Sequence, residues 1–265
     1  MRLYPIASGS SGNCIYVGSD ETHLLIDTGI SKKRTEEGLN LIDLSLDDID
    51  GILITHEHSD HINGLGVISR KYHIPVYGTG GTIQAIRETD TIGKVDAELF
   101  HEIQADSPFQ LKDITCSPMH TSHDAADPVA YSFDCNGKKM AVATDLGTYD
   151  SYTVDHLKNM DAVLLEANHD VHMLQVGMYP YYLKQRILGD KGHLSNESSG
   201  ELLCEILHDR LQHVILGHLS KVNNLPELAY EAVKMEINMA DSPYKASDFS
   251  ISVAKRSSPS SLVVV

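Results

Sequence analysis

Residues 55–61 have the sequence Thr55-His56-Glu57-His58-Ser59-Asp60-His61, which contains the pattern His-x-His-x-Asp-His. Residues 52–55 before it form an apolar, β-branched run that predicts a buried strand. Residues 62–71 after it predict a helix, in spite of two glycines. The pattern therefore lies on a tight strand-to-helix loop, where extended backbone places His56 and His58 on the same side and the turn brings Asp60 and His61 back toward them.

Three imidazoles and one carboxylate within six positions indicate a metal site. Imidazole suits zinc, iron or manganese, and a carboxylate adds affinity for hard cations. A single histidine is usually a solvated or hydrogen-bonded side chain, but four ligand-type residues directly after a buried strand are poorly explained in that way. The sequence therefore predicts that His56, His58, Asp60 and His61 bind metal.

Length and composition favour one globular domain over residues 1–265. The chain is 42% hydrophobic, which suffices for one large core. It contains no apolar run that suggests a membrane span, and residues 1–6 lack the features of a signal peptide, so we expect a cytoplasmic protein. The four cysteines have no CxxC spacing and are expected to be reduced thiols.

The charge of the chain is strongly negative, with a formal net charge of -16 at pH 7 and a pI near 5.2. A surface of this kind repels polyanions. A role on nucleic acid would therefore depend on a local basic patch and on the charge of bound metal.

Further polar motifs follow or connect predicted strands. Residues 8–13, Ser-Gly-Ser-Ser-Gly-Asn, are either a flexible hairpin turn or a loop whose amides and hydroxyls, including Ser10 and Ser11, face a substrate anion. Asp27 is either a turn residue or a residue that orients the histidine loop. Asp145 precedes Leu146-Gly147 and could be a turn former, but its position after a metal motif favours a ligand.

The remaining chain is expected to contain both strands and helices. Residues 89–112 are expected to be a polar region without a strand, and no period indicates an internal repeat. The expected strands are 3–6, 14–17, 23–27, 74–77, 114–117, 129–134, 139–144, 162–166, 214–216 and 250–253, and the expected helices are 31–41, 81–88, 152–159, 196–208 and 226–239.

The order of the ligand-type residues resembles that of the metallo-β-lactamase superfamily: His56, His58, Asp60 and His61, then His123, Asp145 and His218. Six motifs resemble its YycJ/WalJ branch more closely, and they extend the resemblance over essentially the whole chain. These motifs are residues 8–13, 122–128, 143–147, 168–170, 191–196 and 217–220. Ala130 departs from the branch, where a glycine is expected before Tyr131.

The resemblance implies an α/β fold, a four-layer αββα sandwich with two packed mixed sheets and helices outside. It also implies two divalent metal ions, Mn²⁺ or Zn²⁺ and possibly Fe²⁺. His56, His58 and His123 would hold the first ion. Asp60, His61 and His218 would hold the second, and Asp145 would bridge them. Two such ions about 3.5–4 Å apart hold a hydroxide nucleophile near neutral pH.

The activity implied by the resemblance is that of a metal-dependent phosphodiesterase, a 5′-to-3′ exonuclease on double-stranded DNA with a part in mismatch repair or cell-wall stress control. Asp60 would also orient the hydroxide. His193 lies in a loop after Gly192, between Asp145 and His218 in the chain, and it either caps or packs near the start of the next helix or is the general acid. The candidate substrate contacts are Ser10, Ser11, Asn168, His169, Lys184 and Arg186. The last two, together with Lys191, form either a local cationic strip or solvated charges of a helix.

Two other classes of function stay open at the level of sequence. Because the same metals polarise carbonyls, the chain could be another metallo-hydrolase, namely a cyclic phosphodiesterase, a thioesterase or a lactonase. It could also be a metal-bearing interaction protein in a repair or signalling complex. A β-lactamase is disfavoured, since lactamases of this fold usually have cysteine at the position of Asp145.

Overall fold

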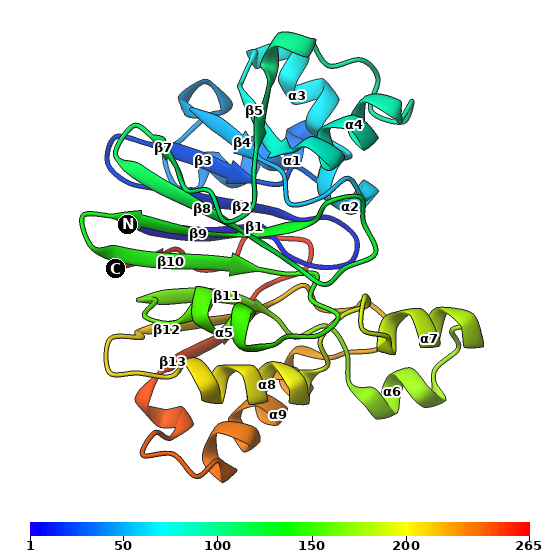
Figure 1. Cartoon of the computed structure of the whole chain (residues 1–265), viewed down its shortest axis with the longest axis vertical. Coiled ribbons are helices and arrows are strands. Elements are labelled where there is room, and N and C mark those ends of the chain that lie inside the picture. Colours follow the sequence, from blue (N-terminus) through cyan, green and yellow to red (C-terminus); the bar gives the residue numbers. More distant parts are fainter.

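A computed structural model describes all 265 residues and contains two seven-stranded mixed sheets (Figure 1). The first sheet has the order β14-β1-β2-β3-β4-β5-β6 and the second has the order β13-β12-β11-β10-β9-β8-β7. The strands of the first sheet are β1 (Arg2–Ala7), β2 (Cys14–Gly18), β3 (His23–Ile26), β4 (Gly51–Leu53), β5 (Val76–Thr79), β6 (Phe100–Ile103) and β14 (Val263–Val264). Those of the second are β7 (Phe109–Leu111), β8 (Ile114–His120), β9 (Val129–Cys135), β10 (Lys138–Ala143), β11 (Ala162–Glu166), β12 (His213–Gly217) and β13 (Ser250–Val253).

Helices cover the outer face of each sheet (Figure 1). The first sheet carries α1 (Lys32–Asn40), α3 (Leu65–Tyr72) and α4 (Gly80–Glu88), and the second carries α5 (Ser151–Leu157), α8 (Asn196–Ile206) and α9 (Pro226–Met239). Three short helices, α2 (Ser59–Ile62), α6 (Val171–Val176) and α7 (Tyr181–Leu188), lie at one edge, and single 3₁₀ turns occupy Leu46–Asp48, Ala97–Leu99 and Ala246–Asp248. The predicted αββα sandwich is confirmed.

Three hydrophobic clusters hold these layers together. One lies between the sheets and joins residues of both, such as Val17 of β2 and Leu164 of β11. The other two fill the spaces between each sheet and its helices. Every residue of β2 and β11 is buried, because both strands are covered on both faces. The two sheets therefore share one central cluster.

The two sheets bring several parallel strands to a common edge. Neighbours from β3 to β6 pair in parallel, and so do neighbours from β10 to β13. The candidate loops follow the carboxyl ends of β3, β4, β10, β11 and β12. The chain termini lie at the opposite edge in Figure 1, where the Met1 amine donates a 2.8 Å hydrogen bond to the carbonyl of Val265.

The structure corrects one expectation about local structure. Residues 89–112 contain two strands, β6 and β7, where the sequence predicted none. Both are edge strands, and three of the four residues of β6 are at least partly exposed, so β6 lacks the apolar alternation of a half-buried strand. Strand β7 does alternate, as Phe109-Gln110-Leu111, but it is only three residues long. The cysteines are free thiols, as expected. No helix has the length and apolar composition needed to cross a membrane.

Two hydrogen bonds tie the histidine loop to the opposite sheet. The buried Tyr131 hydroxyl on β9 donates to the carbonyl of Ile54, at 2.9 Å, just after β4. The amide of Val129 donates to the carbonyl of Thr55 at 3.0 Å. Burial raises the pKa of Tyr131, so its hydroxyl stays protonated as a donor. The start of the histidine loop is therefore held by both sheets.

We expect Tyr131→Phe to lower the free energy of unfolding by about 1–2 kcal/mol, since it removes a buried hydrogen bond without changing the packing of the ring. Urea unfolding monitored by circular dichroism, in the presence of a chelator, measures this difference without a contribution from metal. A midpoint and slope equal to those of the wild type would contradict the prediction.

Candidate active site

The histidine loop turns as the sequence predicts. His58 has extended backbone and directly precedes α2, whose first turn contains Asp60 and His61. The turn is tightly packed, because the amide of Thr28 donates to the carbonyl of His61 at 2.8 Å. A Cβ on Gly29 would lie only 1.6 Å from the carbonyl oxygen of Asp60, so this close approach requires glycine. The loop after β3 thus braces the loop after β4.

The first group of ligand-type side chains joins His56, His58 and His123, which offer nitrogens within 4.8 Å of one another. Nδ1 of His58 lies 3.3 Å from Nε2 of His123. The other ring nitrogen of His123, Nδ1, lies 3.0 Å from the carbonyl of Gly192 and donates to it. Nδ1 of His56 contacts the Thr55 hydroxyl at 3.0 Å, which leaves its Nε2 for the group.

The second group joins Asp60, His61 and His218. Oδ2 of Asp60 lies 3.6 Å from Nε2 of His61 and 3.7 Å from Nε2 of His218. In both histidines Nδ1 is bound to a buried carboxylate, Asp27 for His61 and Glu166 for His218. Their Nε2 atoms are therefore the ones that can ligate an ion.

Asp145 lies between the two groups and is buried. Its Oδ2 lies 3.4 Å from Nε2 of His61, and its Oδ1 lies 3.6 Å from Nε2 of His123. Its two oxygens therefore contact one histidine of each group, which is the arrangement that a bridging ligand needs. Its φ of +62° belongs to the left-handed region, which positions this carboxylate at a cost in backbone strain.

The residues present fit two divalent ions. Three buried ligand atoms have no hydrogen-bond partner: Nε2 of His56, Nε2 of His218 and Oδ2 of Asp145. A buried polar atom without a partner costs about 1–3 kcal/mol, so all three atoms are stabilised if they coordinate a cation. Imidazole nitrogens and carboxylate oxygens suit Zn²⁺, Mn²⁺ and Fe²⁺.

Burial and neighbouring charges set the protonation of this cluster. Burial and the surrounding imidazoles hold the pKa of His56 well below its usual value, so this ring is neutral and able to ligate. Burial would also lower the pKa of His61, but Asp145 and Asp27 outweigh it and raise that pKa to about 9. His61 therefore attracts a positive charge to its site from either a proton or a metal ion.

Asp27 orients the histidine loop, which is one of the two roles that the sequence left open. Its Oδ2 accepts hydrogen bonds from Nδ1 of His61 at 2.7 Å and from the Thr55 hydroxyl at 2.9 Å. Its Oδ1 accepts from the amide of Thr55 at 2.8 Å. Two sides of the loop are thus fixed by one carboxylate.

Glu166 orients histidines on the second sheet in the same way, although no motif in the sequence indicated it. Oε1 accepts 2.8 Å hydrogen bonds from Nδ1 of both His193 and His218. Oε2 accepts from the amides of Leu146 and Leu194. The two imidazoles hold the pKa of Glu166 below its usual value in spite of complete burial. The available signal was an acid that ends an otherwise apolar strand.

His193 lies beside both ligand groups. Its ring centroid is 5.0 Å from that of His123 and 5.3 Å from that of His218. Because Nδ1 donates to Glu166, Nε2 is the nitrogen left for a substrate, and the side chain is 12% exposed. Asp145, Glu166, His193 and His218 also offer ligand atoms within 4.8 Å of one another. However, Glu166 already accepts 2.8 Å hydrogen bonds from His193 and His218, so this group orients the two histidines and is not a third metal site.

The loop over residues 8–13 meets the site with its buried residues. Nδ2 of Asn13 lies 3.1 Å from Nε2 of His61, and the Ser8 hydroxyl accepts a 2.9 Å hydrogen bond from the amide of His218. Ser10 and Ser11 are exposed on the outer side of the loop. The loop is therefore more than a flexible turn, since its ends brace the second ligand group.

The remaining candidate residues lie at different depths. Asn168 is buried, and its Nδ2 donates to the carbonyl of His218 at 2.9 Å. His169 is also buried, neither of its ring nitrogens has a hydrogen-bond partner, and burial lowers its pKa to about 4. Lys184 donates to the carbonyl of Gln175 at 2.7 Å, and Nη2 of Arg186 lies 2.8 Å from Oδ1 of Asp124.

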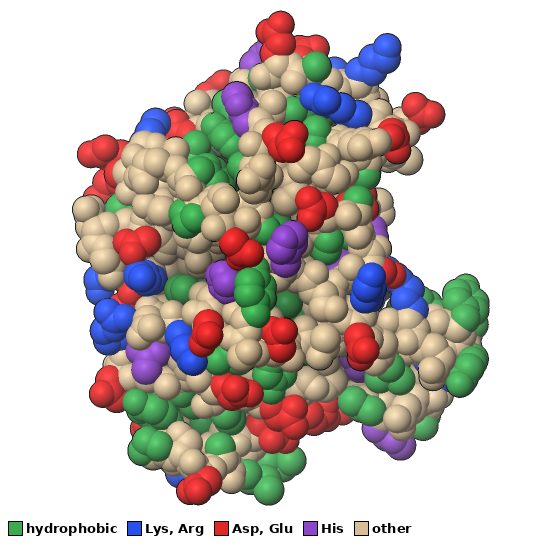
Figure 2. All heavy atoms as spheres, in the orientation of Figure 1, with side chains coloured by type: hydrophobic (Ala, Val, Ile, Leu, Met, Phe, Trp, Pro, Cys, Tyr) green, Lys and Arg blue, Asp and Glu red, His purple; other side chains and the backbone are tan.

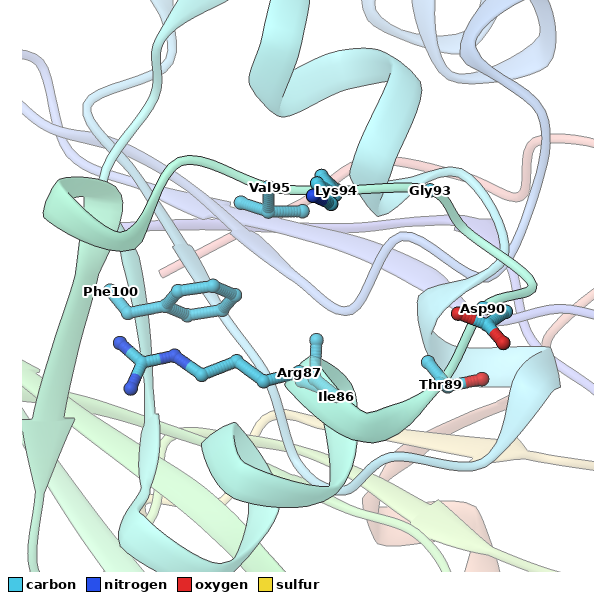
Figure 3. Close-up of a pocket in the computed structure, with 8 residues that line it drawn as sticks. All are labelled: Ile86, Arg87, Thr89, Asp90, Gly93, Lys94, Val95 and Phe100. Atoms are coloured by element: carbon cyan, nitrogen blue, oxygen red, sulfur yellow. The ribbon is translucent and has the colours of Figure 1, made fainter.

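A separate pocket of about 320 Å³ lies between the end of α4 and β6 (Figure 3). Arg87 places its guanidinium 5.1 Å from the ring centroid of Phe100 there. The lining contains no histidine and one carboxylate, Asp90. This pocket therefore lacks the ligand set of the histidine cluster.

Comparisons with known proteins agree with this geometry. A family model described as the beta-lactamase superfamily domain matches residues 22–215. The chain is 42% identical over 228 residues to "Exodeoxyribonuclease YycJ" of Bacillus anthracis, covering 86% of each chain. It is 42% identical over 236 residues to "Exodeoxyribonuclease WalJ" of Streptococcus pneumoniae, covering 89% of this chain and 88% of the relative.

Solved structures agree on the fold. The metallo-β-lactamase fold protein YhfI of Bacillus subtilis has a TM-score of 0.70 at 15% identity, with 97% of each chain covered. Zinc-bound PqqB of Methylobacterium extorquens has a TM-score of 0.72 at 14% identity, with all of each chain covered. At these identities the likeness concerns the arrangement of the sheets and helices alone.

We expect Glu166→Gln to weaken metal binding about 10- to 100-fold, because one amide oxygen cannot accept the hydrogen bonds that both carboxylate oxygens now accept. Titration of the metal-free protein against a chromophoric chelator measures the affinity. Asp161→Asn is the matched control: Asp161 is also buried and accepts a 2.8 Å hydrogen bond from an amide, but it precedes β11 at the far end. Equal affinities in the two variants would contradict the prediction.

Proposed function

We propose that this chain, which belongs to the metallo-β-lactamase superfamily and is a metal-dependent hydrolase, is an exodeoxyribonuclease that shortens double-stranded DNA from its 5′ ends. The observation that carries the proposal is the 42% identity to two exodeoxyribonucleases over nearly the whole chain. The cluster of histidines and aspartates supports it, because such a cluster provides a hydrolytic metal centre.

The proposed ligands are divided as the two groups of side chains suggest. His56, His58 and His123 would hold one ion, Asp60, His61 and His218 would hold the other, and Asp145 would be shared between them. Two bound divalent ions, Mn²⁺ or Zn²⁺ in this proposal, supply positive charge to the scissile phosphate and lower the pKa of a water. The protein contributes the rigid orientation of the donor atoms through Asp27 and Glu166.

Asp60 has a second part in the proposal. Its side chain is 27% exposed, whereas those of His61 and His218 are almost completely buried. This acid is therefore the member of the second group that reaches the open side of the centre. From there a carboxylate oxygen accepts a hydrogen bond from the attacking water and orients it toward phosphorus.

His193 supplies the proton that the departing 3′-oxygen needs. The hydrogen bond from its Nδ1 to Glu166 fixes the orientation of the ring and directs Nε2 away from that carboxylate. A general acid in this position typically contributes 10²–10⁴-fold to the rate. Asn168 supports the backbone of His218 through the hydrogen bond from its Nδ2 to the carbonyl of that residue.

Local cations offset the negative surface where the substrate enters. Arg186 is paired with Asp124, the neighbour of His123, and its side chain stays 43% exposed. Lys184 precedes it by two residues on α7, and Ser10 and Ser11 offer hydroxyls on the loop over residues 8–13. Few phosphates are neutralised by so few side chains, so the salt dependence of binding is shallow. A part in DNA repair, with a repair or signalling protein as partner, belongs to the same proposal.

The proposal is tested with linear duplexes labelled at either end and supplied with Mn²⁺ or Zn²⁺. We expect shortening from the 5′ ends, faster with a 5′-phosphate, and little cleavage of closed circular DNA. Asp145→Ala is the control for contaminating nuclease, because it loses at least one ion and nearly all activity while it stays folded. Comparable rates on circular DNA, or faster hydrolysis of a thioester than of DNA, would overturn the proposal.

The part of His193 is tested by the leaving group. We expect His193→Ala to slow DNA cleavage 10²-fold or more at unchanged metal content, because an alkoxide leaves poorly without a proton. The same variant should lose much less rate on bis(p-nitrophenyl) phosphate, since nitrophenolate leaves unprotonated. Equal losses on both substrates would show that His193 binds or positions the phosphate instead.

A further inference from the structure

Helices α6 and α7 and the connection between them form an arm, residues 171–188, that projects from the body of the fold (Figure 1). It lies at the edge where α2 and the histidine loop lie. None of the candidate metal ligands lies in the arm, so metal binding does not explain why the arm is there.

The base of the arm is fixed to the candidate active site. The amide of His193 donates to the carbonyl of Ile187 at 3.0 Å, and the Ser122 hydroxyl donates to the carbonyl of Asp190 at 2.6 Å. Arg186 is paired with Asp124. The carboxyl end of α7 is therefore held by the loops that carry His123 and His193, and the amino end of the helix points away from them.

The tip of the arm exposes large apolar and aromatic side chains. Met178 is 93% exposed, Tyr181 76% and Tyr182 75%. Figure 2 shows hydrophobic side chains gathered at the end of the arm. None of the other ten tyrosines is exposed. Exposed neighbouring aromatic rings on a helix that is otherwise fixed in place indicate a binding surface.

The charge of this segment is opposite to that of the chain. Residues 171–191 contain three of the 21 Lys and Arg residues but only one of the 37 Asp and Glu residues. A second copy of this chain would also carry a net charge of -16, so this segment is suited to a polyanion. Aromatic rings beside cations are the combination by which proteins bind single-stranded nucleic acid: cations contact phosphates, and the rings stack on bases.

The spacing along α7 connects the tip to the metal centre. Tyr182 and Arg186 are four residues apart, so they lie on the same face of the helix, about 6 Å apart along its axis. Successive nucleotides of one stacked strand are about 3.4 Å apart. Tyr182 therefore lies about two nucleotides from Arg186, which is at the rim of the site beside His123.

We propose that Tyr181 and Tyr182 stack on unpaired bases at the end of the strand being degraded, and so hold a frayed DNA end against the metal centre. This inference rests on the proposed nuclease function. It makes the arm the part of the enzyme that recognises an end: only an unpaired base, or the last base of a duplex, offers a free ring face for stacking.

The test compares Tyr181→Ala/Tyr182→Ala with Tyr181→Phe/Tyr182→Phe in the metal-loaded protein. The probe is a 5′-phosphorylated single strand with 2-aminopurine near its 5′ end and phosphorothioate linkages that resist cleavage. We expect the alanine pair to bind about 10- to 100-fold more weakly and to lose the quenching of 2-aminopurine, while the phenylalanine pair keeps both. Met239→Ala is the control, because Met239 is an exposed apolar residue at the end of α9, outside the arm. This variant should bind as the wild type does.

Salt dependence separates stacking from charge. The alanine pair should keep the wild-type slope of affinity against salt concentration, whereas Lys184→Ala/Arg186→Ala should reduce it by up to about 2. Unchanged quenching and affinity in the alanine pair, while the wild type still degrades DNA, would overturn the stacking proposal alone. A wild-type dimer that dissociates in the alanine pair would assign the surface to self-association. A wild type that degrades no DNA would instead overturn the proposed function.

Discussion

Buried carboxylates bound to imidazole Nδ1 atoms are the interaction on which the centre depends. Moving a carboxylate out of water costs several kcal/mol, and that cost is offset only if hydrogen bonds and opposite charges surround it. Asp27 accepts three hydrogen bonds and Glu166 accepts four. The same bonds fix the orientation of His61, His193 and His218. The same hydrogen bonds therefore both stabilise the buried acids and set the geometry of the site.

Each sheet contributes one buried carboxylate that orients histidines. Asp27 follows β3 of the first sheet, and Glu166 ends β11 of the second. Each orients a histidine of the second ligand group, and Asp145 contacts both groups from the end of β10. Asp27, Asp145 and His218 have φ values of +59°, +62° and +55°. Three strained residues directly after strands persist because the strands behind them are buried on both faces.

The acidic surface acts on DNA at long range, whereas the site acts at short range. Far from the centre, a net charge of -16 repels DNA and keeps nonspecific binding weak. Close to it, the imidazoles, the bound ions and the cations of α7 provide a small attractive region. Under the proposed function, this distribution of charge favours a strand end that can enter the rim over the side of a long duplex. This balance gives the arm a physical reason to carry aromatic rings, whose stacking is independent of net charge.

Much of the fold and the ligand set could be predicted from local sequence. The His-x-His-x-Asp-His loop follows from its own spacing, and helix α9 and strand β13 were predicted with the bounds that the structure has. A proline at the start of α9 and the period of its apolar residues determine it locally. The order of His123, Asp145 and His218 became informative only with that loop and the family resemblance beside it.

Only the tertiary structure decided the rest. Strands β6 and β7 form because neighbouring strands offer hydrogen bonds to an edge, and patterns of only four and three residues within them are too short to indicate a strand. Glu166 is an ordinary strand-terminal acid until His193 and His218, 27 and 52 residues further on, are brought to it. The tyrosines of the arm would suit a buried core equally well in sequence. Their exposure follows from the way in which α7 is fixed at one end to the loops of His123 and His193, and that arrangement exists only in three dimensions.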